Sequence, residues 1–243
     1  MSANANVIKN SVVYVAEYDM SGDENEIQFT GSVDAKEATV MTDKAHVYKP
    51  GLTEIELVLN GYNAFEALKV DDKMFAKLGT ELIPLSILPV GMGTLGNQAY
   101  LFRGANLGYE SKVTVGEMPT FKLTYKGNAM PVVSGVLIHL PAATSTFPHT
   151  GTGVQVGAIT ALQKGYANLH VLSVTGTGTL TVTIASAATL GGSYTDRLTF
   201  TDATGATAEW KSVNGAITDT FWRVEATVSG ITAATFAVTF GIV

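Results

Sequence analysis

The residues that could do chemistry in this sequence are a glycine-rich loop and four histidines. The loop, Gly91–Gly96, has the Gly-x-Gly-x-x-Gly spacing of a dinucleotide fingerprint, whose third glycine must open a helix that holds the pyrophosphate. Residues 97–103 alternate like a strand instead, so we predict a hairpin or loop here. The histidines show neither the spacing of metal ligands nor acidic neighbours at ligand distance, which predicts no metal site. They are His46, His139, His149 and His170.

Other catalytic arrangements are also missing from the sequence. There is no cysteine, which excludes thiolate metal sites, disulfides and cysteine nucleophiles. The serine of Ser134–Gly135 lies inside an apolar strand pattern rather than in a nucleophile elbow. The acidic segment Asp19–Asn25 lacks the EF-hand pattern and favours a turn. We therefore predict no catalytic residue, no metal and no cofactor, and the alternative of a nucleotide-dependent enzyme rests on the glycine loop alone.

Carboxylates on one strand are the clearest candidates for a function that is not catalytic. Glu54 and Glu56 alternate with Ile55, Leu57 and Leu59, so they share the polar face of a strand. Such a face is either simply hydrated or an acidic wall that repels anions. Weaker candidates for the same wall are Asp34 and Glu37.

A long excursion over Met41–Leu52 carries apolar residues with little core of its own. A loop of this kind either packs locally or meets a partner. The residues that could contact a partner are Lys44, Val47, Tyr48, Lys49 and Leu52.

The elements that must position these residues are mainly strands. Short runs with period-two alternation recur throughout, as in Val13–Tyr18 and Glu54–Leu59. One helix is expected over 65–78, with an interruption near Val70 left open. The fold class predicted is mainly β: a barrel or sandwich with one helix, followed by a smaller immunoglobulin-like β-sandwich.

Composition divides the 243 residues into two parts. The segment 142–153 is rich in Thr, Gly and small residues, so we expect domains over 1–141 and 154–243 joined by this linker. Of the total net charge of −6, the first 150 residues carry −5. This acidity disfavours a protein that grips nucleic acid. No stretch of eighteen apolar residues or signal sequence is evident, so we expect no membrane association.

Aromatic residues in the second part offer an alternative function. Tyr194, Trp210 and Trp222 could stack on the rings of a saccharide or contact a receptor, as in a β-sandwich binding module. Strand alternation places Phe221 and Trp222 on opposite faces, so at most one of these two belongs to the core side.

The order of several short motifs resembles the major tail proteins, or tail tube proteins, of long-tailed bacteriophages. This likeness covers about residues 7–140, and its motifs are Asp19–Asn25, Ala38–Asp43, Pro50–Leu52 and Leu59–Tyr62 followed by a helix. The second part looks like a β-sandwich module of phage virion proteins, in the segments His170–Gly176, Tyr194–Phe200 and Phe221–Gly230.

The resemblance implies a structural virion protein that stacks as hexameric rings. Sheets of neighbouring subunits would join into a barrel around a channel through which DNA passes without specific binding. The partners implied are further copies of the chain and other tail proteins: the tape measure, the tail terminator and the distal tail protein. Assembly would take place in the host cytoplasm, and the sandwich would decorate the outside of the tube. Glu54, Glu56, Asp34 and Glu37 would then be candidates to face the channel.

Overall fold

A computed structural model describes residues 11–41, 44–66, 69–91, 93–127 and 132–243. Strand pairings in both units are antiparallel, and the one helix within the described residues, α1 (Val70–Phe75), is short. The predicted mainly β fold with one helix is therefore confirmed. The helix is shorter than the 65–78 prediction and begins at Val70, where the interruption was expected. No helix in the described part of the chain is both long and apolar enough to cross a membrane.

The chain forms two compact units, each built from separate segments of the sequence. Unit 1 contains residues 1–22, 83–103 and 132–243, and unit 2 contains residues 23–82 and 104–131. Strand β6 (Gln98–Lys112) runs through both: its residues 98–101 pair with β8 (Val133–His139) and its residues 104–112 pair with β7 (Thr120–Gly127).

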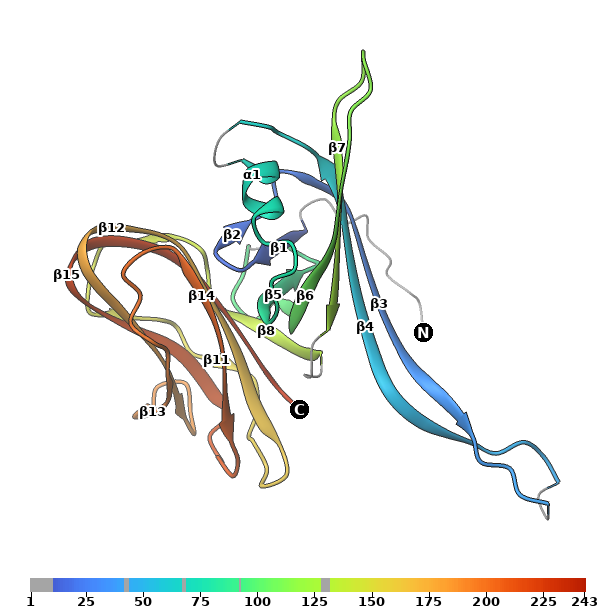
Figure 1. The fold of residues 1–243 in the computed structure, drawn as a ribbon. Helices are drawn as coiled ribbons and strands as arrows, with labels where there is room; N and C mark the ends of the chain where they lie inside the picture. The colour runs from blue at the N-terminus through green and yellow to red at the C-terminus, as the bar shows by residue number, and fades with distance from the viewer. Residues whose placement is uncertain (1–10, 42–43, 67–68, 92, 128–131) are drawn as a thin grey trace. The chain divides into compact units, whose positions relative to one another are not determined.

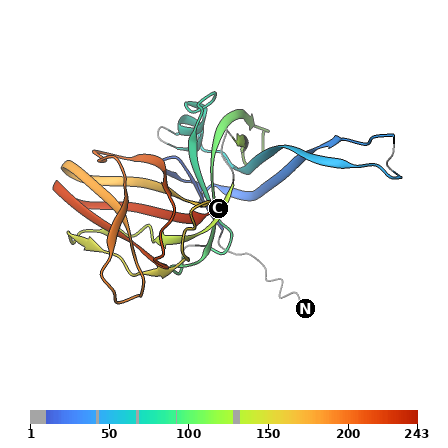
Figure 2. The same ribbon diagram turned by 90° about the horizontal axis from the view of Figure 1, so that it is seen from below.

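Unit 2 is a four-stranded antiparallel sheet with α1. Its strand order is β3 (Glu24–Glu37), β4 (Tyr48–Tyr62), β7 and the second half of β6. Gly61 of β4 lies so close to the Asp23 carbonyl that an added Cβ would sit 2.1 Å from its oxygen. This explains a glycine in the Leu59–Tyr62 motif. Beyond the sheet, β3 and β4 continue as a two-stranded arm (Figures 1 and 2).

Unit 1 is built on two long strands, β12 (Lys164–Ala187) and β15 (Phe221–Ile242), which pair along nearly their whole length. The pairing changes register between Val171 and Thr179, where the curved ribbons bend (Figure 1). Gly178 has a φ of +154°, and an added Cβ would lie 1.7 Å from the Ser229 carbonyl oxygen. The bend therefore requires glycine.

Shorter strands complete unit 1 on either side of this bend. The first half of β12 also pairs with β14 (Thr207–Asn214) and its second half with β13 (Thr195–Thr199). A core that includes Leu169, Ile184 and Phe240 holds residues from both halves. The remaining strands of the unit are β1 (Val12–Val15), β2 (Tyr18–Asp19), β5 (Ile83–Leu88), β9 (Ala143–Thr144), β10 (His149–Thr150) and β11 (Val154–Gln155).

A buried polar network joins early and late parts of the chain inside unit 1. His170 on β12 contacts the Ala16 carbonyl oxygen through Nδ1 (2.6 Å) and the Ser86 hydroxyl through Nε2 (2.8 Å). Asn168 donates to the Leu85 carbonyl (2.8 Å). The segments around Ala16 and Leu85–Ser86 therefore share the interior of unit 1 with β12.

The segment predicted as a linker, 142–153, runs along β15. Ala143 pairs with Thr235, and His149 pairs with Ala226. Whether 1–141 and 154–243 fold as separate domains stays a prediction.

Candidate functional site: the polar face of the four-stranded sheet

Strand β4 places its two central carboxylates on one face of the unit 2 sheet. Leu57 and Leu59 are fully buried, whereas Glu54 is exposed and Glu56 is half-buried. Successive residues of a strand point to opposite faces, so this burial pattern follows from the alternation in the sequence. The strand is therefore amphipathic over residues 54–57, as predicted, whereas Val58, on the side of the carboxylates, is also buried.

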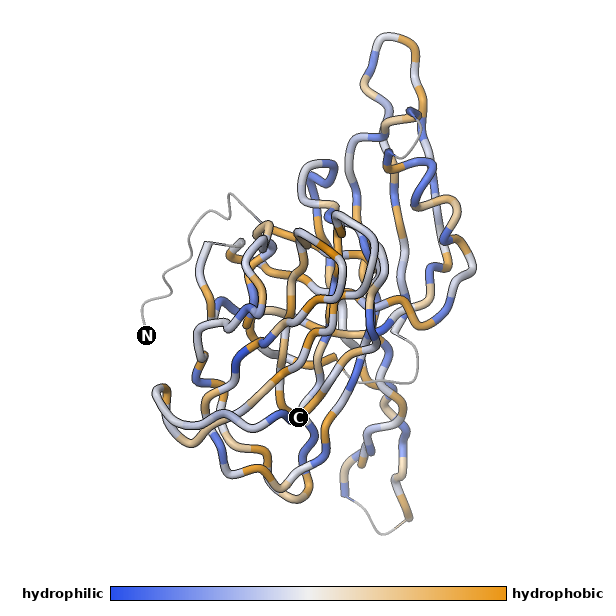
Figure 3. Tube along the Cα trace, turned by 90° about the vertical axis from the view of Figure 1, so that its left-hand side faces the viewer, coloured by the Kyte–Doolittle hydropathy of each residue, from blue (hydrophilic) through white to orange (hydrophobic). Residues whose placement is uncertain are grey.

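The neighbouring strands continue the polar face in register. Glu56 lies opposite Thr30 on β3 and Lys126 on β7, and Asn60 lies opposite Glu26 and Lys122. On β6, Glu110 lies opposite Lys122. The charged residues that this register assigns to the face are Glu26, Glu54, Glu56, Glu110, Lys112, Lys122 and Lys126. Figure 3 shows the alternation of hydropathy along the chain from which such faces arise.

The opposite face is fixed by apolar packing beneath α1. Val70 and Met74 of the helix are buried, as are Leu123 and Tyr125 of β7. The Tyr125 hydroxyl donates to the Met74 sulfur (3.6 Å), and the Asn106 amide donates to the Met74 carbonyl oxygen (3.4 Å). Burial of these apolar side chains leaves the sheet one face for solvent or a partner.

Ion pairs across the strands moderate the acidity of the polar face. Lys126 forms a hydrogen-bonded ion pair with Glu54 and a second pair with Glu56 at 3.5 Å. The hydrogen bond to Glu54 raises the pKa of Lys126. Lys122 pairs with Glu110 at 3.5 Å. Four glutamates against three lysines leave the face with a charge of −1, which is weaker than the wall that Glu54 and Glu56 alone would form.

The weaker predicted candidates, Asp34 and Glu37, lie further along the β3–β4 arm. Asp34 pairs with Lys36 (3.2 Å), and both side chains are mostly exposed. Glu37 contacts His46 (2.6 Å), and this hydrogen bond lowers the pKa of Glu37. Each carboxylate thus has a basic neighbour on the arm itself, and neither shares the Lys126 ion pairs of Glu54 and Glu56.

The excursion predicted as a loop over Met41–Leu52 is largely the end of the arm. Strand β3 reaches Glu37 and β4 already begins at Tyr48, with Glu37 paired to Tyr48 and Lys36 to Lys49. Thr42 and Asp43 lie outside the described residues. Cross-strand hydrogen bonds form even though the arm has almost no core. Its predicted contact residues are all exposed: Lys44, Val47, Tyr48, Lys49 and Leu52.

A second apolar tip, between β6 and β7, was missed by sequence reasoning. Val113, Val115 and Met118 are 68%, 102% and 66% exposed. Gly116 adopts a positive φ and turns the chain at this tip. Apolar residues beside a Gly-containing turn were the available signal. Both tips show hydrophobic segments at the ends of their hairpins (Figure 3).

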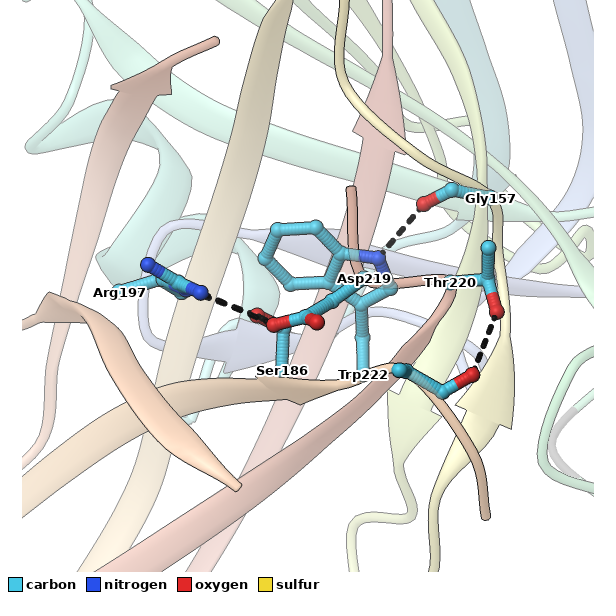
Figure 4. Close-up of polar contacts among 7 residues, drawn as sticks. Gly157, Ser186, Arg197, Asp219, Thr220 and Trp222 are labelled. Carbon is cyan, nitrogen blue, oxygen red and sulfur yellow. Dashed lines mark hydrogen bonds and ion pairs between the residues drawn. The ribbon is translucent and has the colours of Figure 1, made fainter. Parts of the chain in front are cut away.

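The three aromatic residues considered for ligand binding lie in three different environments of unit 1. Trp222 is fully buried, and its indole nitrogen donates to the Gly157 carbonyl (2.8 Å; Figure 4). Its ring is therefore closed to a ligand. Trp210 packs against Tyr166, with ring centroids 5.3 Å apart. The Tyr194 ring is covered by the Arg223 guanidinium at 3.8 Å.

Beside Trp222, a cluster of polar side chains is internally satisfied. Arg197 donates to Ser186 (2.8 Å) and to Asp219 (2.9 Å), and Ser186 donates to Asp219 (2.7 Å; Figure 4). Hydrogen bonds from Ser186 and Arg197 lower the pKa of Asp219. These contacts connect β12 and β13 to the segment just before β15. The cluster therefore has a structural role.

The predictions for the glycine loop and for the histidines agree with the structure to different extents. Strand β6 follows the loop where a nucleotide fingerprint needs a helix, which confirms the predicted loop or hairpin. In contrast, the histidines are not all scattered, because Nε2 of His139 lies 3.2 Å from Nε2 of His149. Within the described residues there is no group of three or more His, Cys, Asp or Glu side chains arranged to hold a metal ion.

Neither the models of protein families nor the curated proteins contain a match to this sequence. Among solved structures, the chain is similar to one from the "Virion of native gene transfer agent (GTA) particle", at 8% identity and a TM-score of 0.42, over 54% of this chain and 98% of that one. It is similar to the SPP1 Dit (gp 19.1) protein at 9% identity and a TM-score of 0.38, over 97% and 100% of the two chains. A chain of the phage p2 baseplate gives 8% identity and a TM-score of 0.33, over 94% and 97%. Likenesses with TM-scores below 0.5 establish neither a shared fold nor a shared function.

Proposed function

We propose that this chain is a structural subunit of a phage tail tube, in which the unit 2 sheets of successive subunits join around a channel for DNA. The observation that carries the proposal is a four-stranded amphipathic sheet whose two edges, β3 and the end of β6, have no outer strand partner among the described strands. Within the described residues, β3 pairs only with β4, and residues 108–112 of β6 pair only with β7. The resemblance of residues 7–140 to tail tube proteins supports six subunits in each ring.

The direction of the strands favours this closure. In the order β3, β4, β7, β6, each strand is antiparallel to the next, so β3 and β6 run in opposite directions. A second copy that places its β3 beside this β6 continues the antiparallel alternation. Long open edges invite pairing with other chains, and closing a ring removes them all.

The polar face suits a channel wall that DNA passes without binding. A lumen rich in unpaired lysine would hold phosphates through counterion release, whereas here Lys122 and Lys126, two of the three lysines of the face, are paired with glutamates. Six copies of a face with charge −1 would repel DNA weakly. We propose Glu54 and Glu56 as lumen residues, with Asp34 and Glu37 further along the arm.

The remaining assignments follow from this arrangement. The tips of the two hairpins would contact the next ring, and the other partners would be the tape measure, tail terminator and distal tail proteins. The sandwich of unit 1 would lie outside the tube, and the protein would belong to the virion. Electron microscopy of the concentrated protein should reveal hollow stacked rings. Dispersed monomers that bind a saccharide would favour the alternative of a virion surface binding protein instead.

A charge reversal tests the lumen assignment. In tubes of the double variant Glu54→Lys/Glu56→Lys, added short duplex DNA should become protected from nuclease at low salt, because the wall would now bind phosphates. The matched control, Asp196→Lys/Asp202→Lys, makes the same change in charge on unit 1 and should protect no more DNA than the unaltered tube. Equal protection by the control and the double variant would show that Glu54 and Glu56 do not face the channel.

A further inference from the structure

The one histidine pair of the described chain joins the end of β8 to β10. His139 is the last residue of β8, and His149 is the first residue of β10. Their Nε2 atoms lie 3.2 Å apart, with ring centroids at 5.0 Å and planes at 86°. If both rings pointed straight along the line that joins the two nitrogens, their centroids would lie farther apart than observed. The rings are therefore inclined to the line between the two nitrogens.

This separation fits two ligands of one metal ion. Zinc binds imidazole nitrogen at about 2.0–2.1 Å, so two nitrogens at tetrahedral or right-angled positions around it lie about 2.9–3.4 Å apart. The observed 3.2 Å falls inside this interval.

The other contacts of His139 hold its ring in a suitable orientation. Its Nδ1 lies 3.0 Å from the Phe236 carbonyl oxygen, which can only accept, so Nδ1 carries the proton and Nε2 offers a lone pair. The ring also stacks on Phe236 at 4.1 Å and 6°. A histidine that binds a metal through one nitrogen usually donates the other to a carbonyl or carboxylate, as His139 does here.

Both imidazoles are suited to bind as neutral ligands. Without metal, Nε2–H of His149 donates to Nε2 of His139. When a metal binds, the proton on His149 moves from Nε2 to Nδ1, so the charge of the protein does not change.

We propose that His139 and His149 form a two-histidine site for a divalent transition metal such as Zn²⁺, with solvent completing the coordination. Imidazole is a suitable ligand for Zn²⁺, Cu²⁺ and Ni²⁺. Bound metal would tie residue 149 to the end of β8 and so close the intervening segment, 140–148, against β15. The site is independent of the proposed tube function.

The test is Zn²⁺ binding by the untagged full-length protein. Calorimetry measures the affinity, and thermal unfolding measures the change in Tm. Zn²⁺ at a hundred times its Kd should raise the Tm by about 5–10 °C. His149→Ala should reduce affinity at least tenfold and abolish the Tm shift. The matched control is His46→Ala, which removes an exposed histidine that contacts Glu37 on unit 2 and should bind Zn²⁺ like the unaltered protein.

Two results would overturn the proposal. One is a failure of the unaltered protein to bind Zn²⁺ at millimolar concentration. The other is unchanged binding in His149→Ala, or in His149→Gln should the alanine variant unfold. Tube formation need not change in any of these variants, so the outcome is separate from that of the tube proposal.

Discussion

The two units of this chain solve the burial of their strands in different ways. Unit 1 encloses a core between two long bent strands and satisfies buried polar groups such as Asn168 and His170 internally. Unit 2 buries one face of a sheet under a six-residue helix and leaves the other face, two edges and two apolar tips open. The contrast indicates that unit 1 is complete within one chain, whereas unit 2 has surfaces suited to further copies.

The largest predicted effect on the difference between the two units comes from removing the chain after Ala143. The sequence suggested that such a truncation folds. In the structure, however, β8 pairs with β15, and Ser86 contacts His170 and Thr239. Losing β12 and β15 would leave buried polar groups unpaired and apolar strands exposed. We expect no cooperative unfolding transition for residues 1–143, as measured by circular dichroism. A folded truncation that assembles would instead establish the predicted domain boundary.

Acid should weaken unit 1 before unit 2. Burial lowers the pKa of His139 and of His170 to about 4, below the ordinary value of 6.5. Because the unfolded chain binds these protons first, the stabilisation is complete above pH 6.5 and declines as the pH falls toward 4. Each histidine contributes a slope of up to about 1.4 kcal/mol per pH unit in that window.

Urea unfolding at several pH values, followed by the fluorescence of Trp210 and Trp222, measures this slope in unit 1. The variant His170→Gln should reduce this slope by up to about 1.4 kcal/mol per pH unit, which is the contribution of one histidine proton. His46→Ala is the control, since this exposed histidine belongs to unit 2. A stability that is flat between pH 6.5 and 4.5 would contradict the buried neutral state of both histidines.

The smallest effect on folding should come from the tip of unit 2. Val115 is fully exposed, so Val115→Asp should leave the Tm within about 1 °C of the unaltered value, as expected for a surface substitution. If the tip contacts the next ring, the same variant should fail to form tubes, because a buried unpaired charge is costly. Leu162→Asp, which changes an equally exposed residue of unit 1, should assemble normally. Tubes formed equally well by both variants would remove the tip from the interface.

Sequence reasoning succeeded for features set by neighbouring residues in the sequence and failed for contacts between residues that only the fold brings together. The polar face around Glu54 and Glu56 was predictable because period-two alternation is local. The Lys126 ion pairs were not, since they need the register of β4 with β7. His139 and His149 are ten residues apart and meet only because β8 and β10 both pair with β15, which no spacing rule anticipates. Trp222 was grouped with possible ligand aromatics because alternation identifies opposite faces but not which one becomes the core.

In the proposed tube, the sheet of unit 2 continues from one copy to the next. Disulfide cross-linking between copies is the most direct test of this shared sheet. The chain contains no cysteine, so an introduced pair reports only on its own contact. One cysteine replaces Glu110 on β6, and the other replaces Glu26, Gln28 or Thr30 on the same face of β3. Single-cysteine variants serve as controls because they can form nothing larger than a dimer. We predict that at least one pair, oxidised after assembly, gives a ladder of covalent species that reaches six subunits. Only monomers and dimers from all three pairs, in preparations that contain tubes, would contradict the shared sheet.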